Sequence, residues 1–172
     1  MNLCKRLIAA LSVTAMMTSA HAAKPSTEVV HACLQGQSGG HTIWTAIATN
    51  EVGSDDDFQG GYKATLFTAN GRDVGYAEKD GRDGLIWGRT IVPLKRAVPL
   101  DQPPEKPSTF TPMLAEWSTI KQGSQKFLCV NFNFDGLGRS GSFQKVHGLY
   151  LMSIPQRAKA KPTLFYGVRL IE

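Results

Sequence analysis

Apolar and polar residues alternate along most of this chain, which is the pattern of β-strands that bury one face. The clearest case is the segment 125–134. Its two faces would be formed by Leu128, Val130, Phe132 and Phe134 on one side and by Cys129, Asn131 and Asn133 on the other. Strand-forming residues bounded by turn residues predict further strands at 28–34, 42–49, 62–68, 74–78, 85–92, 143–154 and 163–171.

Glycine-containing turns separate these segments and favour antiparallel neighbours. Asn70-Gly71 supplies the two residues that a tight hairpin needs, because both tolerate a positive φ. Residues 80–84 and the glycine-rich residues 135–142 predict two further turns. The pattern therefore predicts a mainly β fold, a single antiparallel β-sandwich or barrel-like domain of seven or eight strands.

Two segments depart from the strand pattern. Pro93 to Pro112 contains six of the nine prolines, which exclude a helix or a central strand. We expect a long proline-rich crossover here, and long connections of this kind are candidate contact surfaces. Residues 113–121 carry apolar residues at helical spacing and predict the one short helix of the domain. These apolar residues are Met113, Leu114, Trp117 and Ile120.

The N-terminus has the three parts of a secretory signal peptide. Lys5 and Arg6 are followed by the apolar residues 7–17 and then by Ala20-His21-Ala22, a small-x-small cleavage pattern. The apolar run is shorter than the roughly 20 residues that span a bilayer. We therefore expect residues 1–22 to be removed and residues 23–172 to form a single periplasmic or secreted domain with no transmembrane segment.

Removal of the signal peptide changes the number of cysteines. Cys4 is lost, which leaves Cys33 and Cys129 as an even pair in an exported chain. Such a pair predicts one disulfide, here between the first predicted strand and a late one. Closing a loop of nearly 100 residues stabilises a fold by about 4–5 kcal/mol in the chain-entropy model, less any strain. The alternative is two unpaired buried thiols.

Charge excludes one class of partner and leaves another open. Without Lys5 and Arg6 the chain holds 17 basic and 14 acidic side chains, too mild an excess to indicate nucleic-acid binding. The excess is uneven, because residues 121–172 hold 8 basic and 2 acidic side chains. Weak contact with an anionic surface is one interpretation, and a solvated basic face is the simpler one.

Gly36-Gln37-Ser38-Gly39-Gly40 matches the G-x-S-x-G motif of serine hydrolases, and His147 lies downstream. That chemistry requires the serine on a strand-to-helix turn above a parallel sheet. Strand-forming residues follow here instead, so a glycine-rich loop explains the match more simply. A small secreted hydrolase that uses Ser38 and His147 stays an alternative.

The candidate metal sites are incomplete. Asp55, Asp57 and Gly60 match three positions of a calcium-binding loop, but the twelfth position is Leu66 instead of a glutamate. This excludes an EF-hand and leaves a solvated acidic loop as the default, with a calcium site formed by these aspartates and another loop as the alternative. His31, His41 and His147 have no metal-ligand spacing. We therefore expect no metal and no cofactor.

These observations favour an exported, non-catalytic binding protein that acts on a protein partner, as an inhibitor, an immunity-type protein or an accessory subunit does. Loops on a rigid sheet commonly carry recognition. The candidate binding residues are Gln37, Ser38, His41, Asp55, Asp56, Asp57, Arg139 and Ser140. Besides the hydrolase, the remaining alternative is a surface module that binds lipid or glycan through the basic C-terminal part.

Overall fold

The computed structural model describes residues 24–50, 52–101, 115–133, 146–156 and 160–170. The helices are α1 (Thr27–Gln35) and the short 3-10 helix η1 (Leu94–Arg96). The first strands are β1 (Thr42–Ala46), β2 (Gly53–Phe58), β3 (Tyr62–Ala69), β4 (Arg72–Lys79), β5 (Arg82–Trp87) and β6 (Thr90–Pro93). The later strands are β7 (Val98–Pro99), β8 (Glu116–Gln122), β9 (Gln125–Asn133), β10 (Val146–Ile154) and β11 (Leu164–Leu170).

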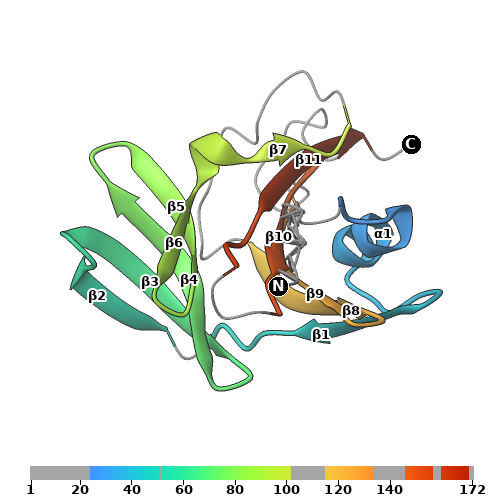
Figure 1. Cartoon of the computed structure of the whole chain (residues 1–172), viewed down its shortest axis with the longest axis horizontal. Coiled ribbons are helices and arrows are strands. Elements are labelled where there is room, and N and C mark those ends of the chain that lie inside the picture. Colours follow the sequence, from blue (N-terminus) through green and yellow to red (C-terminus); the bar gives the residue numbers. More distant parts are fainter. Residues whose placement is uncertain (1–23, 51, 102–114, 134–145, 157–159, 171–172) are drawn as a thin grey trace, which may run out of the picture.

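The strands form two sheets that face each other as in a sandwich (Figure 1). The larger sheet has the order β1-β8-β9-β10-β11-β7, and the smaller has the order β2-β3-β4-β5-β6. All neighbouring strands are antiparallel except β11 and β7. The predicted mainly β, antiparallel sandwich with one short α-helix is therefore confirmed, and the described strands form no closed barrel.

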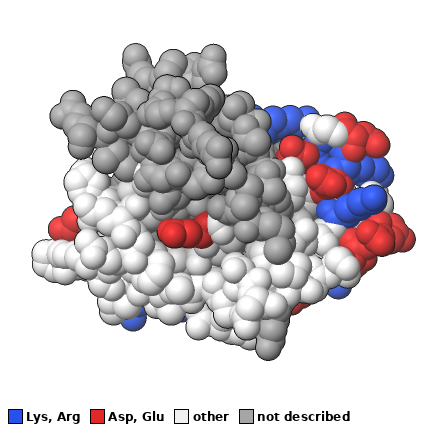
Figure 2. Space-filling model, turned by 180° about the vertical axis from the view of Figure 1, so that it is seen from behind, with Lys and Arg blue, Asp and Glu red and all other residues white. Residues whose placement is uncertain are grey.

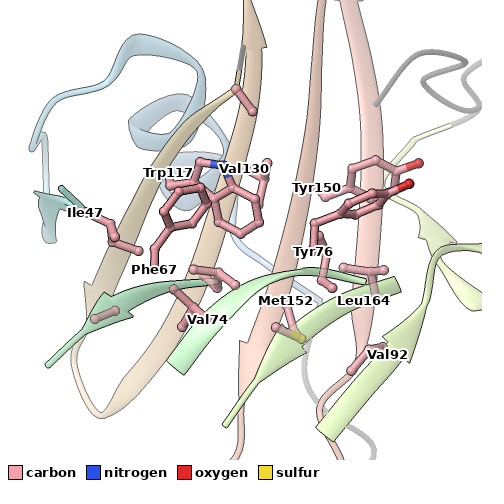
Figure 3. Close-up of a cluster of buried hydrophobic side chains, with 14 of the residues drawn as sticks. Ile47, Phe67, Val74, Tyr76, Val92, Trp117, Val130, Tyr150, Met152 and Leu164 are labelled. Atoms are coloured by element: carbon pink, nitrogen blue, oxygen red, sulfur yellow. The ribbon is translucent and has the colours of Figure 1, made fainter. Parts of the chain in front are cut away.

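Large apolar side chains from both sheets fill the space between them (Figure 3). Phe67 of the smaller sheet packs on Trp117 of the larger one, with ring centroids 5.1 Å apart. Phe132 and Tyr150 meet edge to face at 6.1 Å. Leu128, Val130 and Phe132 share this inward face, as the alternation in 125–134 predicts.

Helix α1 covers the opposite face of the larger sheet and buries a second apolar cluster there (Figure 1). Val29 of the helix and Phe127 of β9 belong to this cluster. The predicted disulfide is present between Cys33 and Cys129, so it ties α1 to the centre of the sheet. The side-chain amide of Asn131 donates a hydrogen bond to the Leu34 carbonyl beside it. Strand β9 is thus buried on both faces.

The strand predicted at 28–34 is wrong, because these residues form α1. The hydroxyl of Ser26 caps the helix by accepting the Val29 N–H at 3.3 Å, and Gly36 ends it with φ 62°. Its buried residues, Val29, Val30, Ala32 and Cys33, recur at helical spacing. Their β-branched content obscured the two caps, which are the ordinary start and stop signals of a helix.

The helix predicted at 113–121 is also wrong, because Glu116–Gln122 is strand β8. Trp117 faces the inter-sheet core, and Ile120 faces the helix layer. A strand that is buried on both faces loses its strict alternation, and an apolar pair three residues apart then imitates a helix. Met113 and Leu114 lie outside the described residues.

The structure corrects two other predictions about strands. The segment 85–92 is not one strand, because Gly88 turns the chain with φ 60° between β5 and β6. Strand β2 was predicted as an acidic loop. The hairpin at Asn70-Gly71 is confirmed, with φ 51° and 70°. The proline-rich segment contains η1 and β7, and its residues 102–112 are not among those described.

The outer face of the smaller sheet has its own apolar cluster, formed by Phe58, Ala64, Ala77 and Ile86. Two glycines allow its strands to approach closely. A Cβ atom on Gly75 would lie 1.9 Å from the Thr65 carbonyl oxygen, and one on Gly84 would lie 2.6 Å from a methyl group of Ile91. Neither position has room for a side chain.

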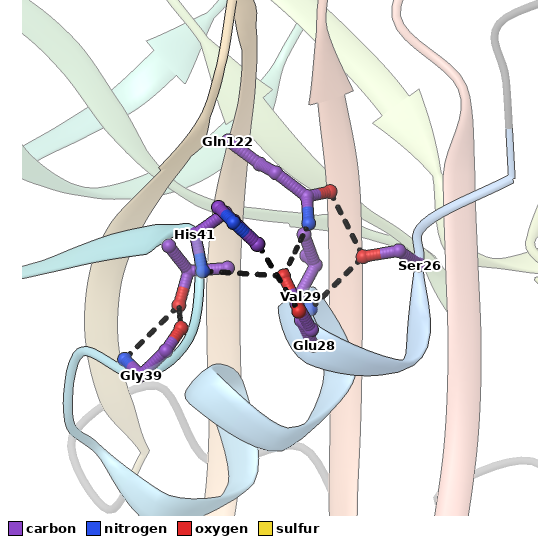
Figure 4. A network of polar contacts seen from close by, with 7 residues as sticks. Ser26, Glu28, Val29, Gly39, His41 and Gln122 are labelled. Carbon is purple, nitrogen blue, oxygen red and sulfur yellow. Dashed lines mark hydrogen bonds and ion pairs between the residues drawn. The ribbon is translucent and has the colours of Figure 1, made fainter.

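A polar network fixes the start of α1 to the larger sheet (Figure 4). The Glu28 carboxylate accepts hydrogen bonds from the His41 backbone N–H at 3.3 Å and from the Gln122 amide at 2.9 Å. The Ser26 hydroxyl donates to the Gln122 side-chain oxygen at 2.8 Å. The His41 N–H is the largest cause of a lowered pKa at Glu28.

The predicted signal peptide falls in residues 1–23, outside the described part of the chain. Neither helix formed by the described residues has the length and apolar content needed to cross a bilayer. Among the described residues, β1 and β7–β11 belong to the larger sheet and β2–β6 to the smaller one, so the larger sheet takes strands from both before and after the smaller sheet in the sequence.

Replacing both Cys33 and Cys129 with alanine should lower the free energy of unfolding by about 4–5 kcal/mol, because the disulfide closes a loop with a sequence separation of 96 residues. Urea unfolding of the oxidised protein and of the double variant measures the difference. Wild type unfolded in the presence of a reductant is the control and should match the variant. Equal stability of all three would contradict a stabilising disulfide.

Glu28→Gln should change how stability depends on pH. A carboxylate whose folded pKa is lowered stabilises the fold above its ordinary pKa near 4.5, and this contribution is lost as pH falls through the folded value. Wild type should therefore be more stable than the variant at neutral pH, and the gap should close as pH is lowered below 4.5. Urea unfolding across this range tests it, and a gap that widens in acid would contradict it.

Candidate functional site

A cleft opens between the two sheets at one end of the sandwich, with a volume of about 550 Å³. Fourteen residues line it, from both sheets and from the connections beside them. They are Ile43, Thr45, Ala69, Asn70, Arg72, Trp87, Thr119, Ile120, Lys121, Ser124, Lys126, Ile154, Pro155 and Gln156. The cleft lies within the volume range of small-ligand sites in proteins, roughly 300–1,000 Å³.

The larger sheet contributes one row of side chains across four neighbouring strands. Ile43 pairs with Lys121, Lys121 with Lys126, and Lys126 with Ile154. These residues are in phase with the inward-facing residues of the same strands, such as Leu128 of β9. The row is therefore the outermost row of the core face, and in it the apolar pattern is interrupted by two lysines.

The smaller sheet contributes the inward-facing ends of β4 and β5. Arg72 is in phase with the buried Val74, and Trp87 is in phase with the buried Leu85. The guanidinium carbon of Arg72 lies 5.3 Å from the centroid of the Trp87 ring, a cation–π distance. A planar cation is thus held over an aromatic ring at the wall of the cleft.

The lining residues have a single sign of charge. Arg72, Lys121 and Lys126 are basic, and none of the fourteen residues is acidic. Among the described residues, no carboxylate forms a salt bridge with these three side chains. Elsewhere the signs intermingle, as the charged side chains gathered over the smaller sheet in Figure 2 show. The cleft is therefore a local region of positive potential beside exposed apolar groups, among them Ile43, which is 58% exposed.

The predicted loop 36–40 lies at the edge of the larger sheet, beside β1. The Ser38 hydroxyl accepts the Trp44 backbone N–H at 2.9 Å, so it satisfies a donor on the free edge of β1. His41 contacts Glu28, and Gln37 contacts Gln35. These side chains hold the loop and do not line the cleft.

Ser38 and His147 do not form a nucleophile–base pair. His147 lies on β10 in the face under α1 and is buried, whereas Ser38 is exposed at the edge of β1. Three strand spacings separate β1 from β10, about 14 Å in all. In register, Trp44 is level with Ser153, which is six residues or about 20 Å along β10 from His147.

The acidic loop predicted at residues 55–60 is wrong for residues 55–58, which are part of strand β2. Asp55, Asp56 and Asp57 belong to the edge strand β2 and are all exposed. The register shifts between Asp55 and Phe58, which marks an irregularity of the bulge type. Charges and bulges on an edge strand oppose pairing with another sheet, so the three aspartates protect this edge.

The remaining predicted residues, Arg139 and Ser140, lie outside the described part of the chain. Within the described ranges, no three His, Cys, Asp or Glu side chains come together in a way that could hold a metal ion.

The core between the sheets contains two buried tyrosines, Tyr76 on β4 and Tyr150 on β10. Burial raises the pKa of Tyr76, and a hydrogen bond with Asp83 adds to the effect. Burial also raises the pKa of Tyr150 to about 12. Both phenols therefore stay protonated at neutral pH, and neither supplies a phenolate as nucleophile or base.

The sequence contained a signal for the cleft that loop-based reasoning missed. Lys126 is in phase with the predicted inward face that begins at Leu128. Arg72 is in phase with Val74 at the start of β4, next to the predicted hairpin. Cations that continue an apolar face at a strand end indicate an open end of the core, although they do not show which strands meet there.

Ser38→Ala should leave the Trp44 N–H without its partner and expose the edge of β1. We expect a loss of about 0.5–1.5 kcal/mol and faster hydrogen exchange at the Trp44 amide. Ser54→Ala, at an exposed serine of β2, is the matched control. Hydrogen exchange followed by NMR measures both variants. Unchanged protection of Trp44 in Ser38→Ala would show that the hydroxyl does not seal this edge.

No protein-family model matches the chain, and neither the curated proteins nor the solved structures give a significant match. What the cleft can do therefore follows from its own residues. It offers three cations, one aromatic ring, several hydroxyl and amide groups and exposed apolar side chains to whatever enters it.

Proposed function

We propose that this chain is an exported, non-catalytic binding protein that holds part of a protein partner in the cleft between its two sheets. The observation that carries the proposal is the outermost row of the core face. Its inward-facing positions are cationic or at least partly exposed there, whereas two rows farther in Trp117, Val130 and Tyr150 are buried in the core. This row therefore exposes side chains to solvent at an end of the sandwich where apolar residues would otherwise be buried, and the exposed side chains can contact a partner.

The lining favours binding over chemistry. It contains no histidine, cysteine, aspartate or glutamate, so it offers no base or acid that titrates near neutral pH and no thiol nucleophile. The serine and threonine hydroxyls there have no adjacent base among the lining residues. Binding, in contrast, requires only shape, apolar contact and a few fixed polar groups, and all of these are present.

Export is supported by the Cys33–Cys129 disulfide, because structural disulfides form and persist mainly in oxidising compartments. The signal-like residues at 1–22 point to the same compartment. A periplasmic or secreted location is thus part of the proposal. An inhibitor, an immunity-type protein and an accessory subunit would each act in this way on a partner in the envelope or outside the cell.

Filling the cleft should abolish partner binding. Thr119 lies in the cleft, between Thr45 and Leu128 in register, and is half-buried. The full chain, expressed so that it is exported and oxidised, and its Thr119→Trp variant would serve as baits on envelope and culture-supernatant proteins. Any protein retained by wild type would be purified, and its affinity for both baits would be measured by calorimetry.

The expected result is a partner that binds wild type and binds Thr119→Trp at least about tenfold more weakly. Thr68→Trp is the matched control, because Thr68 is an exposed threonine of β3 outside the lining. It should bind like wild type. Equal affinity of all three baits would show that the cleft is not the binding site, and the absence of any retained protein would count against a protein partner.

A further inference from the structure

We infer that the cleft recognises an extended acidic peptide segment that carries an apolar or aromatic side chain between its carboxylates. This inference rests on the proposed function and names the chemistry of the partner. It follows from three features of the lining, which are three cations that form no salt bridge with a described carboxylate, the Arg72–Trp87 contact and the mixture of polar and apolar groups.

The first feature is the arrangement of the cations on the two sides of the cleft. Lys121 and Lys126 are adjacent in register at the β8–β9 hairpin, and Arg72 stands on the facing sheet. Like charges on neighbouring strands repel, so two adjacent lysines are unfavourable until an anion lies between them. No acidic residue of the lining supplies that anion. Carboxylates of a ligand would be attracted from both walls.

The second feature is that Arg72 is already oriented. The cation–π contact with Trp87 restricts where the Arg72 guanidinium lies, so less side-chain entropy is lost when a carboxylate binds. The planar fork of an arginine can donate two parallel hydrogen bonds to one carboxylate. Arg72 would therefore fix the position of one acidic side chain, while the lysines act as less directional charges.

The third feature is the apolar surface between the cations. Ile43 and Ile154 flank the two lysines in the same row, and Ile43 is largely exposed. An apolar side chain of the ligand would cover these isoleucines and the half-buried Trp87. In an extended peptide, side chains two residues apart point the same way at intervals of about 6.6–6.8 Å. An acidic–x–aromatic–x–acidic segment thus presents all three side chains to the cleft.

A peptide fits the lining better than a lipid or a glycan does. Eight of the fourteen lining residues are polar or charged, and an acyl chain would leave their hydroxyls and amides without partners. A peptide backbone can pair with them. A sugar ring stacks on an open aromatic face, but Arg72 already covers one face of Trp87.

The test uses the oxidised full chain and a synthetic peptide of sequence Ser-Glu-Ser-Phe-Ser-Glu-Ser with blocked ends. Binding is followed by NMR through the indole N–H of Trp87, with the other resonances reporting on the fold. Two comparison peptides replace both glutamates by lysine or the phenylalanine by alanine. Vesicles of phosphatidylglycerol, assayed by co-sedimentation, form a separate arm.

We expect a saturable shift of the Trp87 signal with the acidic peptide and no saturable shift with the lysine peptide. The affinity should fall about tenfold for Lys121→Glu and for Arg72→Ala, and it should fall as salt is added. It should stay unchanged for Lys24→Glu, which makes the same charge change at an exposed site before α1. The alanine peptide should bind more weakly than the phenylalanine peptide.

No saturable shift with the acidic peptide, or equal affinity of Lys121→Glu and Lys24→Glu, would overturn the inference. So would vesicle binding that is lost in Lys121→Glu while the peptide does not bind, because the ligand would then be an anionic lipid surface. If a captured partner is lost in Thr119→Trp but binds Lys121→Glu and Arg72→Ala like wild type, the proposed function stands and only the acidic chemistry is wrong.

Discussion

The covalent bond between Cys33 and Cys129 holds the first element of the chain against the middle of the larger sheet. Strand β9 has apolar side chains on both faces, so this sheet needs a cover on each side. The smaller sheet covers one side, and the nine residues of α1 cover the other. A helix of this length is marginal on its own in water. The disulfide and the Glu28 network keep it in place, and the two-layered core depends on that.

The predictions from sequence succeeded where side chains alternate clearly along a strand and failed where the apolar residues also fit another element. The alternation in 62–68 and 125–134 located β3 and β9, and the paired cysteines gave the disulfide. Strand β8 was mistaken for a helix because its two buried sides, marked by Trp117 and Ile120, remove the alternation. Segment 28–34 was mistaken for a strand because its β-branched residues outweighed the caps at Ser26 and Gly36. Burial on a second face is a tertiary property, and local pattern does not contain it.

The candidate site was also predicted only in part from the sequence. Sequence reasoning placed recognition in the loops, where motifs such as Gly36–Gly40 and Asp55–Gly60 are conspicuous. In the structure the described parts of these segments serve the sheet edges, through Ser38 at β1 and the aspartates of β2. The cleft is formed by single residues at the ends of strands far apart in the chain. The sequence pattern of each strand predicts which face each of these residues lies on. It does not predict that they come together, because that depends on how the two sheets pack against each other.

The hydrogen bond between Ser38 and Trp44 has a consequence for how the chain folds. Loop 36–40 follows α1 directly, so its position depends on the helix that the disulfide secures. The edge of strand β2 is protected by aspartates of the strand itself. The edge of β1 is protected by Ser38, which belongs to the loop between α1 and β1. During folding, β1 is therefore open to pairing with another molecule until α1 is in place, and thiol oxidation is one of the steps that fix it there. Slow oxidation would lengthen that interval, so the yield of monomer would be set by a chemical rate as well as by the stability of the finished fold.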